Sequence, residues 1–466
     1  MSMRFFSFHM LLSFALVMVG CMKVDTDPSP LFCQIKEEIK DLSDASIYWD
    51  ELAAHNVESM DIEEMLRQQL SEDLAIRIAL LNNQDLQAVY QDLGIAKAQL
   101  AQAGLLKNPI FFLSYRFSTR SNITDLIDMS FVQNFLEVFL IPLRKRVAGN
   151  ELEATKSKVM TEVLDVIAHT KIGFYQVQAA EQVWQLKKQY MLATELSFDA
   201  AKRLFSVGNI TALEVSMKRS MYEQAKLDCA SAEVAFLDAR EQLNRLMGLW
   251  GCSIEWKLKK DPPHLPIEKE YRYVENDAIS NSLDLKIAYD ALKATAAEFG
   301  VDTTKLIFPV FDAGVSVERE EGIWYVGPAF NIPIPLFDFG KANSAKARAK
   351  ILKQWHQFSA LAVEIRSWAR MYRFTFLNAY RQSKYTFDVV VPLAKRIFIE
   401  AFEQHNAMQL GVFRLLETKQ NEIEKMILSV EKYKEYQIVR TKIETLMQGH
   451  VIGKHGYFLP VRKYYE

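Results

Sequence analysis

Glu320 and Glu321 are the first residues to consider for catalysis, because two neighbouring carboxylates can divide the roles of acid and base. They stand in the run VEREEGIW, between two short strand-like segments, which favours a solvated loop. The eight histidines are scattered, and His169 and His356 fall within helical patterns, where a core or interhelical role is expected. The sequence contains no HExxH, P-loop or GxSxG motif. We therefore predict no enzyme activity, no cofactor and no metal site.

The N-terminus carries a different kind of chemistry. In residues 1–20 the early charge of Arg4 precedes an apolar run too short to span a membrane, which predicts a signal peptide. Cys21 follows directly, as in bacterial lipoprotein signals whose cysteine receives lipid, although Met18 stands where leucine is usual. We expect acylation of Cys21 and a lipoprotein-like, peripheral segment over 21–72; the alternative is an ordinary residue after a cleaved signal. The other cysteines are too widely spaced for a zinc site or a disulfide framework: Cys33, Cys229 and Cys252.

The composition narrows the class of protein. Of the 466 residues 50% are hydrophobic, and the formal net charge is -2, so no nucleic-acid partner is predicted. Only 13 prolines and 17 glycines occur, which favours long helices over a turn-rich β protein. The basic run 144–146 (RKR) could bind phosphate, but its place just after Pro142 favours anchoring at a membrane interface.

A helix gives way to a strand at Asn108-Pro109. Residues 85–106 have apolar side chains at three- and four-residue steps, the spacing of one buried helical face. Pro109 cannot continue the helix, and from Ile110 the period changes to two, with Phe111 and Leu113 on one side and Ser114 on the other.

The chain repeats itself after about 200 residues. Four landmarks recur in the same order, and they predict a first repeat over 73–260, a second repeat over 270–448 and an unmatched tail over 449–466. Each repeat is predicted to contain a helix, a proline, two strands, a very long helix, a turn and a return helix, in that order. The predicted strands are about 110–118, 126–140, 310–318 and 323–334.

The predicted strands alternate between apolar and polar residues. Phe131 and Val315 lie on apolar faces, whereas Asp128 and Ser316 lie on polar ones. This pattern suits a lipid-facing, water-lined barrel, and it also suits a half-buried sheet in a soluble protein. Four strands cannot close a barrel alone, so the barrel interpretation requires oligomerisation.

With its two repeats and its helix-to-strand change, the sequence resembles the outer-membrane efflux proteins typified by TolC. The resemblance covers about residues 60–447 and rests on Asn108-Pro109, on GPAFNIPIPLFDFGKANSAKARA (327–349) and on VGNITALEV (207–215). It suggests the lipoprotein and heavy-metal branch that serves RND pumps. It implies a mostly α fold: a long antiparallel helical tunnel, and four strands per chain that contribute to a trimeric twelve-stranded transmembrane β-barrel. The helix-to-barrel junctions would then be Asn108, Pro109, Pro142, Pro309 and Pro335.

The resemblance also implies a function. A homotrimer in outer-membrane lipid would passively conduct small solutes, such as drugs or metal ions, delivered by an inner-membrane transporter and a periplasmic adaptor. The adaptor would contact two turns at the periplasmic end of the tunnel. Those turns map onto Val207, Gly208, Asn209 and Leu213 in the first repeat, and His405, Asn406, Ala407 and Leu410 in the second repeat. His405 stands in the place of Gly208.

The aperture of the tunnel maps onto Gly411, Arg414 and Glu417. Arg414 would either ring the constriction with positive charge or pair with Glu417 as an ordinary surface residue. Two other functions stay open for the whole chain. A type I secretion duct shares the fold and differs in its partners, and a lipid-tethered coiled-coil scaffold would need no pore.

Overall fold

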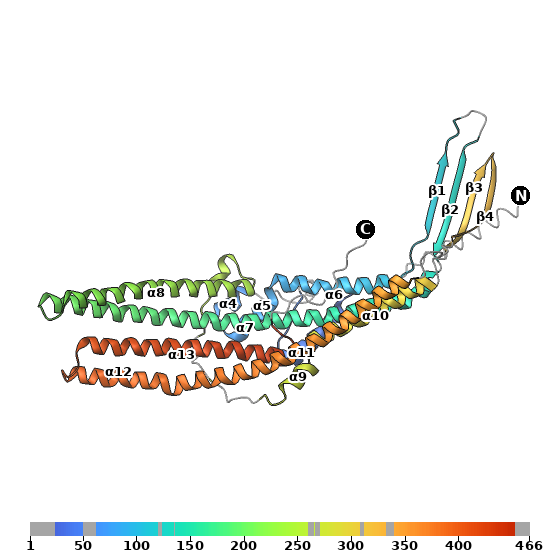
Figure 1. Ribbon diagram of the computed structural model, residues 1–466. Coiled ribbons are helices and arrows are strands. Elements are labelled where there is room, and N and C mark those ends of the chain that lie inside the picture. Colours follow the sequence, from blue (N-terminus) through green and yellow to red (C-terminus); the bar gives the residue numbers. More distant parts are fainter. Residues whose placement is uncertain are drawn as a thin grey trace. The chain divides into compact units, whose positions relative to one another are not determined.

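The computed structural model describes residues 24–49, 62–119, 124–134, 136–259, 265, 271–307, 312–331 and 340–452. The chain divides into two compact units. The first comprises Met1–Pro30, Leu93–Leu152 and Ala294–Ala347, and the second comprises Leu31–Asp92, Glu153–Lys293 and Arg348–Glu466 (Figure 1). The signal segment, Cys21, Pro309 and Pro335 lie outside the described residues.

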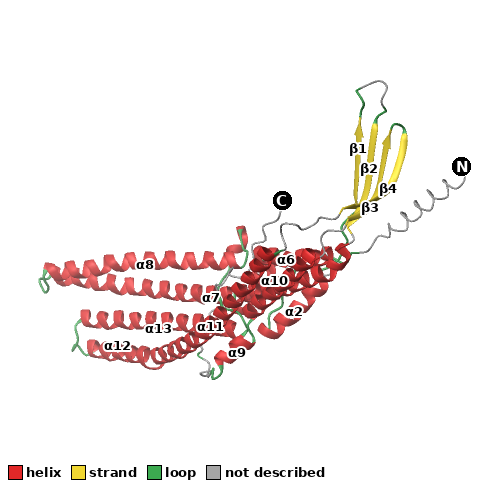
Figure 2. Cartoon of the chain, turned by 45° about the vertical axis from the view of Figure 1, so that its right-hand side comes forward, coloured by secondary structure: helices red, strands yellow, loops and turns green. Residues whose placement is uncertain are grey.

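The first unit contains a four-stranded antiparallel sheet, drawn in yellow in Figure 2. Its strands follow chain order and are β1 (Ile110–Arg116), β2 (Leu126–Asn134), β3 (Asp312–Glu320) and β4 (Ile323–Asn331). All four lie within or close to the predicted segments, but β2 is shorter than the predicted 126–140. Helix α7 begins already at Leu136, because the apolar run after Asn134 continues as a helix that buries Leu140 beside Val301.

Long helices make up most of the second unit. The helices of both units are α2 (Ser29–Ser43), α4 (Ile62–Arg67), α5 (Glu72–Asn82), α6 (Gln84–Ala103), α7 (Leu136–Ser206), α8 (Ala212–Leu246), α9 (Val274–Ser280), α10 (Leu283–Ile307), α11 (Lys341–Tyr385), α12 (Val391–Asn406) and α13 (Val412–Met447). The 71 residues of α7 extend over about 105 Å at 1.5 Å per residue. Among the described helices, none combines the length and the apolar character that crossing a membrane requires.

Gly173 lies inside α7 and does not interrupt the helix. A Cβ atom at this glycine would lie 3.3 Å from Leu246 Cδ1, so the missing side chain lets α8 pack closely. The second copy of the long helix, in contrast, is interrupted. A π-helical segment, Thr386–Val390, joins α11 to α12 just before Pro392.

Among the described residues of the second unit, two apolar clusters form a packed core, one in each repeat. Leu70, Ile78, Val177, Leu243 and Trp256 belong to the first cluster. The second is rich in aromatic side chains and includes Tyr271, Tyr372, Phe376, Tyr380 and Tyr436. Each cluster joins a helix pair to the shorter segments beside it.

The internal repeat is visible in matched hydrogen bonds. Asn82 Nδ2 donates to the carbonyl of Met247 at 3.0 Å, and Asn281 Nδ2 donates to the carbonyl of Met447 at 3.2 Å. Gly248 follows Met247 directly, and Gly449 lies two residues after Met447. Both glycines have a positive φ, and a Cβ atom at either would lie within 2.4 Å of a backbone oxygen. The predicted tail therefore begins as part of the second repeat and not outside it.

The segment before the first repeat is not peripheral as predicted. Phe32 and Ile35 of α2 are buried, and Phe32 packs against Trp49 and Tyr90 with ring centroids 5.4 and 5.2 Å away. Leu70 is fully buried and forms a parallel β-bridge with Leu258. The physical reason is that α2 is amphipathic and must bury its apolar face.

Candidate functional site

The sheet separates apolar from polar side chains by face. Most cross-strand partners on one face are apolar, as in the rows Phe111, Phe131, Val315, Pro328 and Leu113, Met129, Val317, Val326, although Gln133 and Arg319 lie on this face too. Several of these side chains are exposed on the single chain, with Phe111 exposed by 62% and Val326 by 69%. The alternation predicted from the sequence is thus the alternation of the structure.

The opposite face carries polar rows, although Ile110, Phe112 and Val132 also lie on it. One row contains Ser114, Asp128, Glu318 and Tyr325, and Ser130 lies opposite Ser316 in the next. Asp128 lies directly across the strand pair from Glu318. Two like charges in this position repel each other, and water is the environment that screens such repulsion best. The polar face therefore suits an aqueous surface.

A buried carboxylate ties together the two chain passages between helices and strands. Lys107, just before Asn108-Pro109, lies 2.9 Å from Glu137, and Arg144 lies 2.8 Å from the same carboxylate. Glu137 is 5% exposed and stands at the start of α7. Sequence inspection missed Glu137, although a carboxylate in the first turn of a helix beside a basic run is a usable signal.

Pro142 is not at the junction that the sequence suggested. It lies inside α7, six residues after the helix begins, and the neighbouring Leu143 packs on the small cluster of Leu140 and Val301. Proline removes one backbone hydrogen bond there, but packing of the flanking residues holds the helix together. Asn108 and Pro109, in contrast, lie in the loop between α6 and β1.

The first turn of the second unit joins α7 to α8. Gly208 has a φ of +77°, its N–H donates to the carbonyl of Phe205 at 2.9 Å, and Asn209 N–H donates to Leu204 at 2.9 Å. Thr211 then caps α8 through a reciprocal pair of hydrogen bonds with Glu214. Glycine suits this position because a left-handed backbone costs it nothing.

The second turn joins α12 to α13 and corrects the sequence alignment. Met408, not His405, occupies the place of Gly208: its φ is +57° and its N–H donates to the carbonyl of His405 at 2.9 Å. Placing His405 opposite Gly208 also places Asn406 opposite Asn209. In the structure Gln409 corresponds to Asn209, so that alignment is three residues out of register. His405 Nδ1 instead lies 2.8 Å from the carbonyl oxygen of Leu410 and braces the turn from inside.

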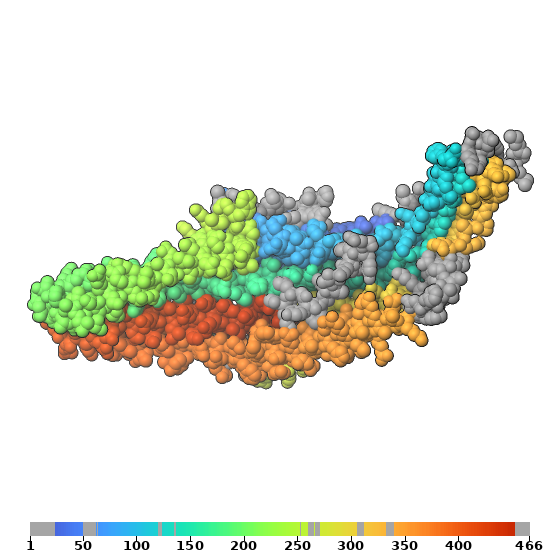
Figure 3. All heavy atoms as spheres, turned by 45° about the horizontal axis from the view of Figure 1, so that its top comes forward, coloured from blue at the N-terminus to red at the C-terminus, as the bar shows by residue number. Residues whose placement is uncertain are grey.

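Both turns lie at the same end of the second unit, one light green and the other orange-red in Figure 3. Lys218 of α8 lies 5.1 Å from the ring centroid of Phe413 in α13, which joins the two hairpins near this end. Apolar side chains are exposed at both turns: Phe205 by 48%, Val207 by 67%, Leu213 by 69% and Met408 by 95%. The structure therefore brings the predicted turn residues of both repeats into one region.

The residues assigned to the aperture start α13. Gly411 is the N-cap of the helix and has extended backbone angles. Arg414 Nη1 donates to Glu417 at 2.8 Å, and both side chains are more than 60% exposed. This is the surface ion pair that the sequence offered as the simpler role for Arg414.

A buried histidine near the end of α13 was not anticipated. His450 is 2% exposed, and its Nδ1 lies 3.0 Å from Asp284 while its Nε2 lies 3.0 Å from Asp165. Burial by itself lowers the pKa of His450, but hydrogen bonds and charge from the two aspartates outweigh it and raise the pKa to about 10. The imidazolium thus joins α7 of the first repeat to both ends of the second.

Within the described ranges, no group of three or more His, Cys, Asp or Glu residues is arranged to hold a metal ion. Cys229 is buried and Cys33 is exposed, and both are free thiols. Glu321 lies in the turn between β3 and β4 with a φ of +50° and is exposed.

Comparison with known proteins gives one family match. Residues 75–249 match the model of the outer membrane efflux protein family. The matched residues lie within the first repeat. No curated protein matches the chain.

Several solved structures share the fold. A membrane protein from Pseudomonas aeruginosa is 15% identical with a TM-score of 0.67, over 86% of this chain and 97% of that one. The CmeC outer membrane channel of Campylobacter jejuni is 17% identical with a TM-score of 0.64, over 81% and 85%. The open MtrE outer membrane channel of Neisseria gonorrhoeae is 16% identical with a TM-score of 0.65, over 83% and 89%.

Proposed function

We propose that this chain, a TolC-like outer-membrane efflux protein in its fold and in the family match of its first repeat, forms the exit duct of a tripartite efflux system. Three copies would each contribute four strands to one barrel in the outer membrane. Their helices would form a periplasmic tunnel. The duct would passively conduct small solutes, such as drugs or metal ions, and an inner-membrane transporter would supply the energy.

The observation that carries this proposal is the two-faced sheet. Its apolar rows are exposed on the single chain, and its polar rows include Asp128 opposite Glu318. Within the sheet, β1 and β4 each pair with only one neighbour. Lipid does not tolerate open backbone edges, so an apolar sheet of this kind needs strands from other copies to close. An aqueous lumen then explains the facing carboxylates.

The two turns of the second unit supply the contact surface for a periplasmic adaptor. Val207 and Met408 expose apolar side chains at one end. The capping pair of Thr211 and Glu214 holds the first turn in place, and the contact of His405 with the carbonyl of Leu410 holds the second. Exposed apolar side chains on a rigid support are typical of protein-binding surfaces. Anchoring through an acylated Cys21 would add a second attachment to the outer membrane.

The particle mass of the purified mature protein, measured by light scattering with and without detergent, tests the proposal. We expect a detergent-dependent particle near three times the 53.7 kDa of one chain. Insertion of that particle into planar bilayers should give ohmic conductance without an energy source. A water-soluble monomer or dimer would exclude the channel, and intact-mass spectrometry of the same sample would show whether Cys21 carries lipid.

A further inference from the structure

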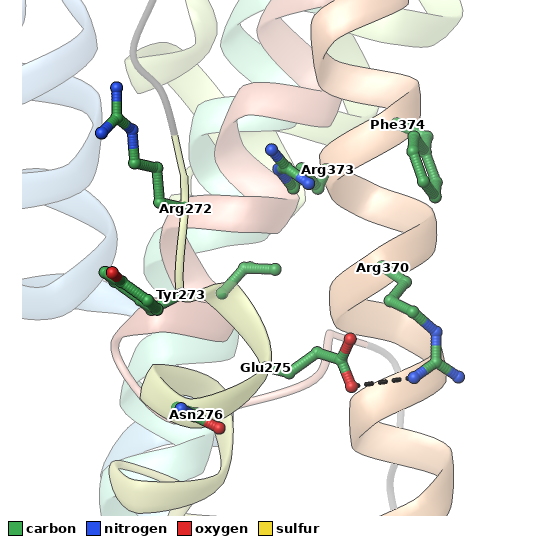
Figure 4. Close-up of a pocket in the computed structure, with 8 residues that line it drawn as sticks. Arg272, Tyr273, Glu275, Asn276, Arg370, Arg373 and Phe374 are labelled. Carbon is green, nitrogen blue, oxygen red and sulfur yellow. Dashed lines mark hydrogen bonds and ion pairs between the residues drawn. The ribbon is translucent and has the colours of Figure 1, made fainter.

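Arginine side chains of this chain stand in two kinds of environment. In the pocket between α9 and α11, Arg370 Nη1 donates to Glu275 at 2.8 Å, so a carboxylate of the same chain balances the charge (Figure 4). Arg319 of β3 differs, because it forms no ion pair with any residue that the structure describes. Its Cζ atom lies 5.5 Å from the ring centroid of Trp324, and an aromatic ring attracts a cation without neutralising it.

Arg319 stands in the last row of the apolar face of the sheet. The row contains Tyr115, Ile127, Arg319 and Trp324, which pair directly across the strands and therefore share one face. The strands end one residue beyond this row, at the end of the sheet away from the connections to α6 and α7. Under the proposed function, on which the inference rests, this end lies at the outer surface of the outer membrane.

Aromatic side chains occur at both ends of the same face. Tyr115 and Trp324 are exposed by 47% and 51% in the last row, and Phe330 is exposed by 63% near the other end of β4. The step from Trp324 to Phe330 extends about 20 Å along the strand. Membrane barrels have an apolar band about 25 Å tall between two such aromatic girdles, which lie at the level of the lipid headgroups. The row of Arg319 therefore falls at headgroup level.

The carboxylates near Arg319 have other partners or point elsewhere. The charge of Asp125, in the loop between β1 and β2, acts on Arg319 from beyond ion-pair distance. The two oxygens of Asp125 accept hydrogen bonds from the Tyr115 hydroxyl at 2.6 Å and from Ser118 N–H at 2.9 Å. The neighbours of Arg319 on either side in β3 are glutamates, which lie on the opposite face. An incoming anion would therefore displace no ion pair of Arg319.

We propose that Arg319 binds the phosphate group of a lipid in the outer leaflet, beside the rings of Trp324 and Tyr115. The Nε atom of Arg319 is buried, so the two terminal Nη groups are the donors. Two parallel N–H groups of a guanidinium match two oxygens of a phosphate. A cation on the lipid face is costly at the middle of the bilayer and is tolerated near the headgroups.

The neighbouring row favours a lipid over free phosphate. Directly next to the row of Arg319, on the same face, lie Leu113, Met129, Val317 and Val326. These side chains offer an apolar surface to the acyl chains of a lipid whose phosphate is held by Arg319. Free phosphate has no group that could use this surface.

Native mass spectrometry of the detergent-solubilised trimer tests the site with two lipids of identical acyl chains, phosphatidic acid and diacylglycerol. We expect saturable binding of one phosphatidic acid for each copy and an affinity about tenfold above that of diacylglycerol. Arg319→Gln should weaken binding of phosphatidic acid about tenfold, since it removes charge-assisted hydrogen bonds. Arg116→Gln removes the same charge from an exposed position on the opposite face at the same end of the sheet, and should leave affinity unchanged.

Light scattering on the same samples separates failure of this inference from failure of the proposed function. If the parent chain forms no detergent-dependent trimer, the proposed function is wrong and the lipid site falls with it. If the trimer forms but phosphatidic acid binds no better than diacylglycerol, or Arg116→Gln weakens binding as much as Arg319→Gln, the inference alone is wrong. Displacement of the lipid by millimolar inorganic phosphate would also overturn it, because the site would then be a general anion site.

A second variant covers the case in which Arg319→Gln does not assemble. Arg319→Lys keeps the positive charge and loses the two parallel donors, so it should form the trimer and bind phosphatidic acid several-fold more weakly than the parent chain. Unchanged affinity in Arg319→Lys would contradict recognition of the phosphate by the guanidinium group.

Discussion

His450 Nε2 lies 3.0 Å from a carboxylate oxygen of Asp165, in a position where both side chains are at most 3% exposed. The second nitrogen of the ring contacts Asp284, whose other oxygen accepts the backbone N–H of Val451 at 3.0 Å. A charged imidazole therefore stands between two carboxylates in the interior. The arrangement ties the end of the second repeat to a helix of the first.

Stability should depend on the protonation of His450. The pKa is raised from 6.5 to about 10 in the folded chain, so the stabilisation is complete below about pH 6.5 and is lost as the pH rises towards 10. Replacing His450 by Gln leaves two buried carboxylates without a cation and should cost about 3 kcal/mol at pH 6. Thermal unfolding at pH 6 and pH 9.5 measures the effect.

His356→Gln, at an exposed position on α11, is the matched control and should change neither melting temperature. A variant at His450 whose deficit is equal at both pH values would show that packing, not charge, accounts for the contribution of this side chain.

The two turns should respond oppositely to glycine and non-glycine residues. Gly208→Ala places a Cβ atom at a φ of +77° and should cost about 1 kcal/mol, whereas Met408→Gly relieves a φ of +57° and should gain about as much. Met408→Gly also removes a side chain that is 95% exposed, so it should weaken adaptor binding while it raises the melting temperature. Paired melting and pull-down measurements test this, and parallel changes in both properties would contradict it.

Neighbouring positions in β3 should differ in their tolerance of charge. Val317→Lys places a cation on the apolar face and should cost about 2 to 4 kcal/mol in lipid, preventing assembly. Ser316→Lys places the same cation on the polar face and should leave the trimer intact with altered ion selectivity. Size-exclusion chromatography and bilayer conductance distinguish the two, and equal assembly defects would mean that the faces are misassigned.

Glu137 should stabilise the passage between helix and strand. Glu137→Gln removes both ion pairs and leaves Arg144, which is 23% exposed, without its anion, so about 1 to 3 kcal/mol should be lost locally. Hydrogen exchange should then accelerate over 104–112 and 132–140. Exchange in α13 serves as the internal control, and uniform acceleration there would indicate global destabilisation instead.

Arg414 gives a prediction in which stability and conductance separate. Its pair with Glu417 is exposed, so Arg414→Ala should change stability by less than about 0.5 kcal/mol. If the residue lies at the aperture, closed-state conductance should nevertheless change. Identical conductance in the variant and the parent chain would remove Arg414 from the gate.

The sequence was sufficient for features that depend on local periodicity. Alternation located all four strands, and Pro109 marked the loop between α6, which ends at Ala103, and β1. It failed where one pattern fits two structures: the apolar run 136–140 suits a strand or a helix, and packing against Val301 decides between them. It failed also in the alignment of the two turns. The shared asparagines suggested that Asn406 matches Asn209, but the backbone geometry shows that Met408 takes the place of Gly208. The pairing of His450 with Asp165 is a tertiary contact that no local pattern encodes.

The π-helical segment Thr386–Val390 has a consequence for how the second long helix is aligned. A π turn holds one residue more than an α turn, so it changes the rotational phase of every residue that follows by about 100°. As a result, the set of α12 side chains that faces α13 differs from the set that an unbroken α-helix continuing from α11 would present. The first repeat keeps a single phase through its 71-residue helix, so the two repeats share their connectivity but not their angular register.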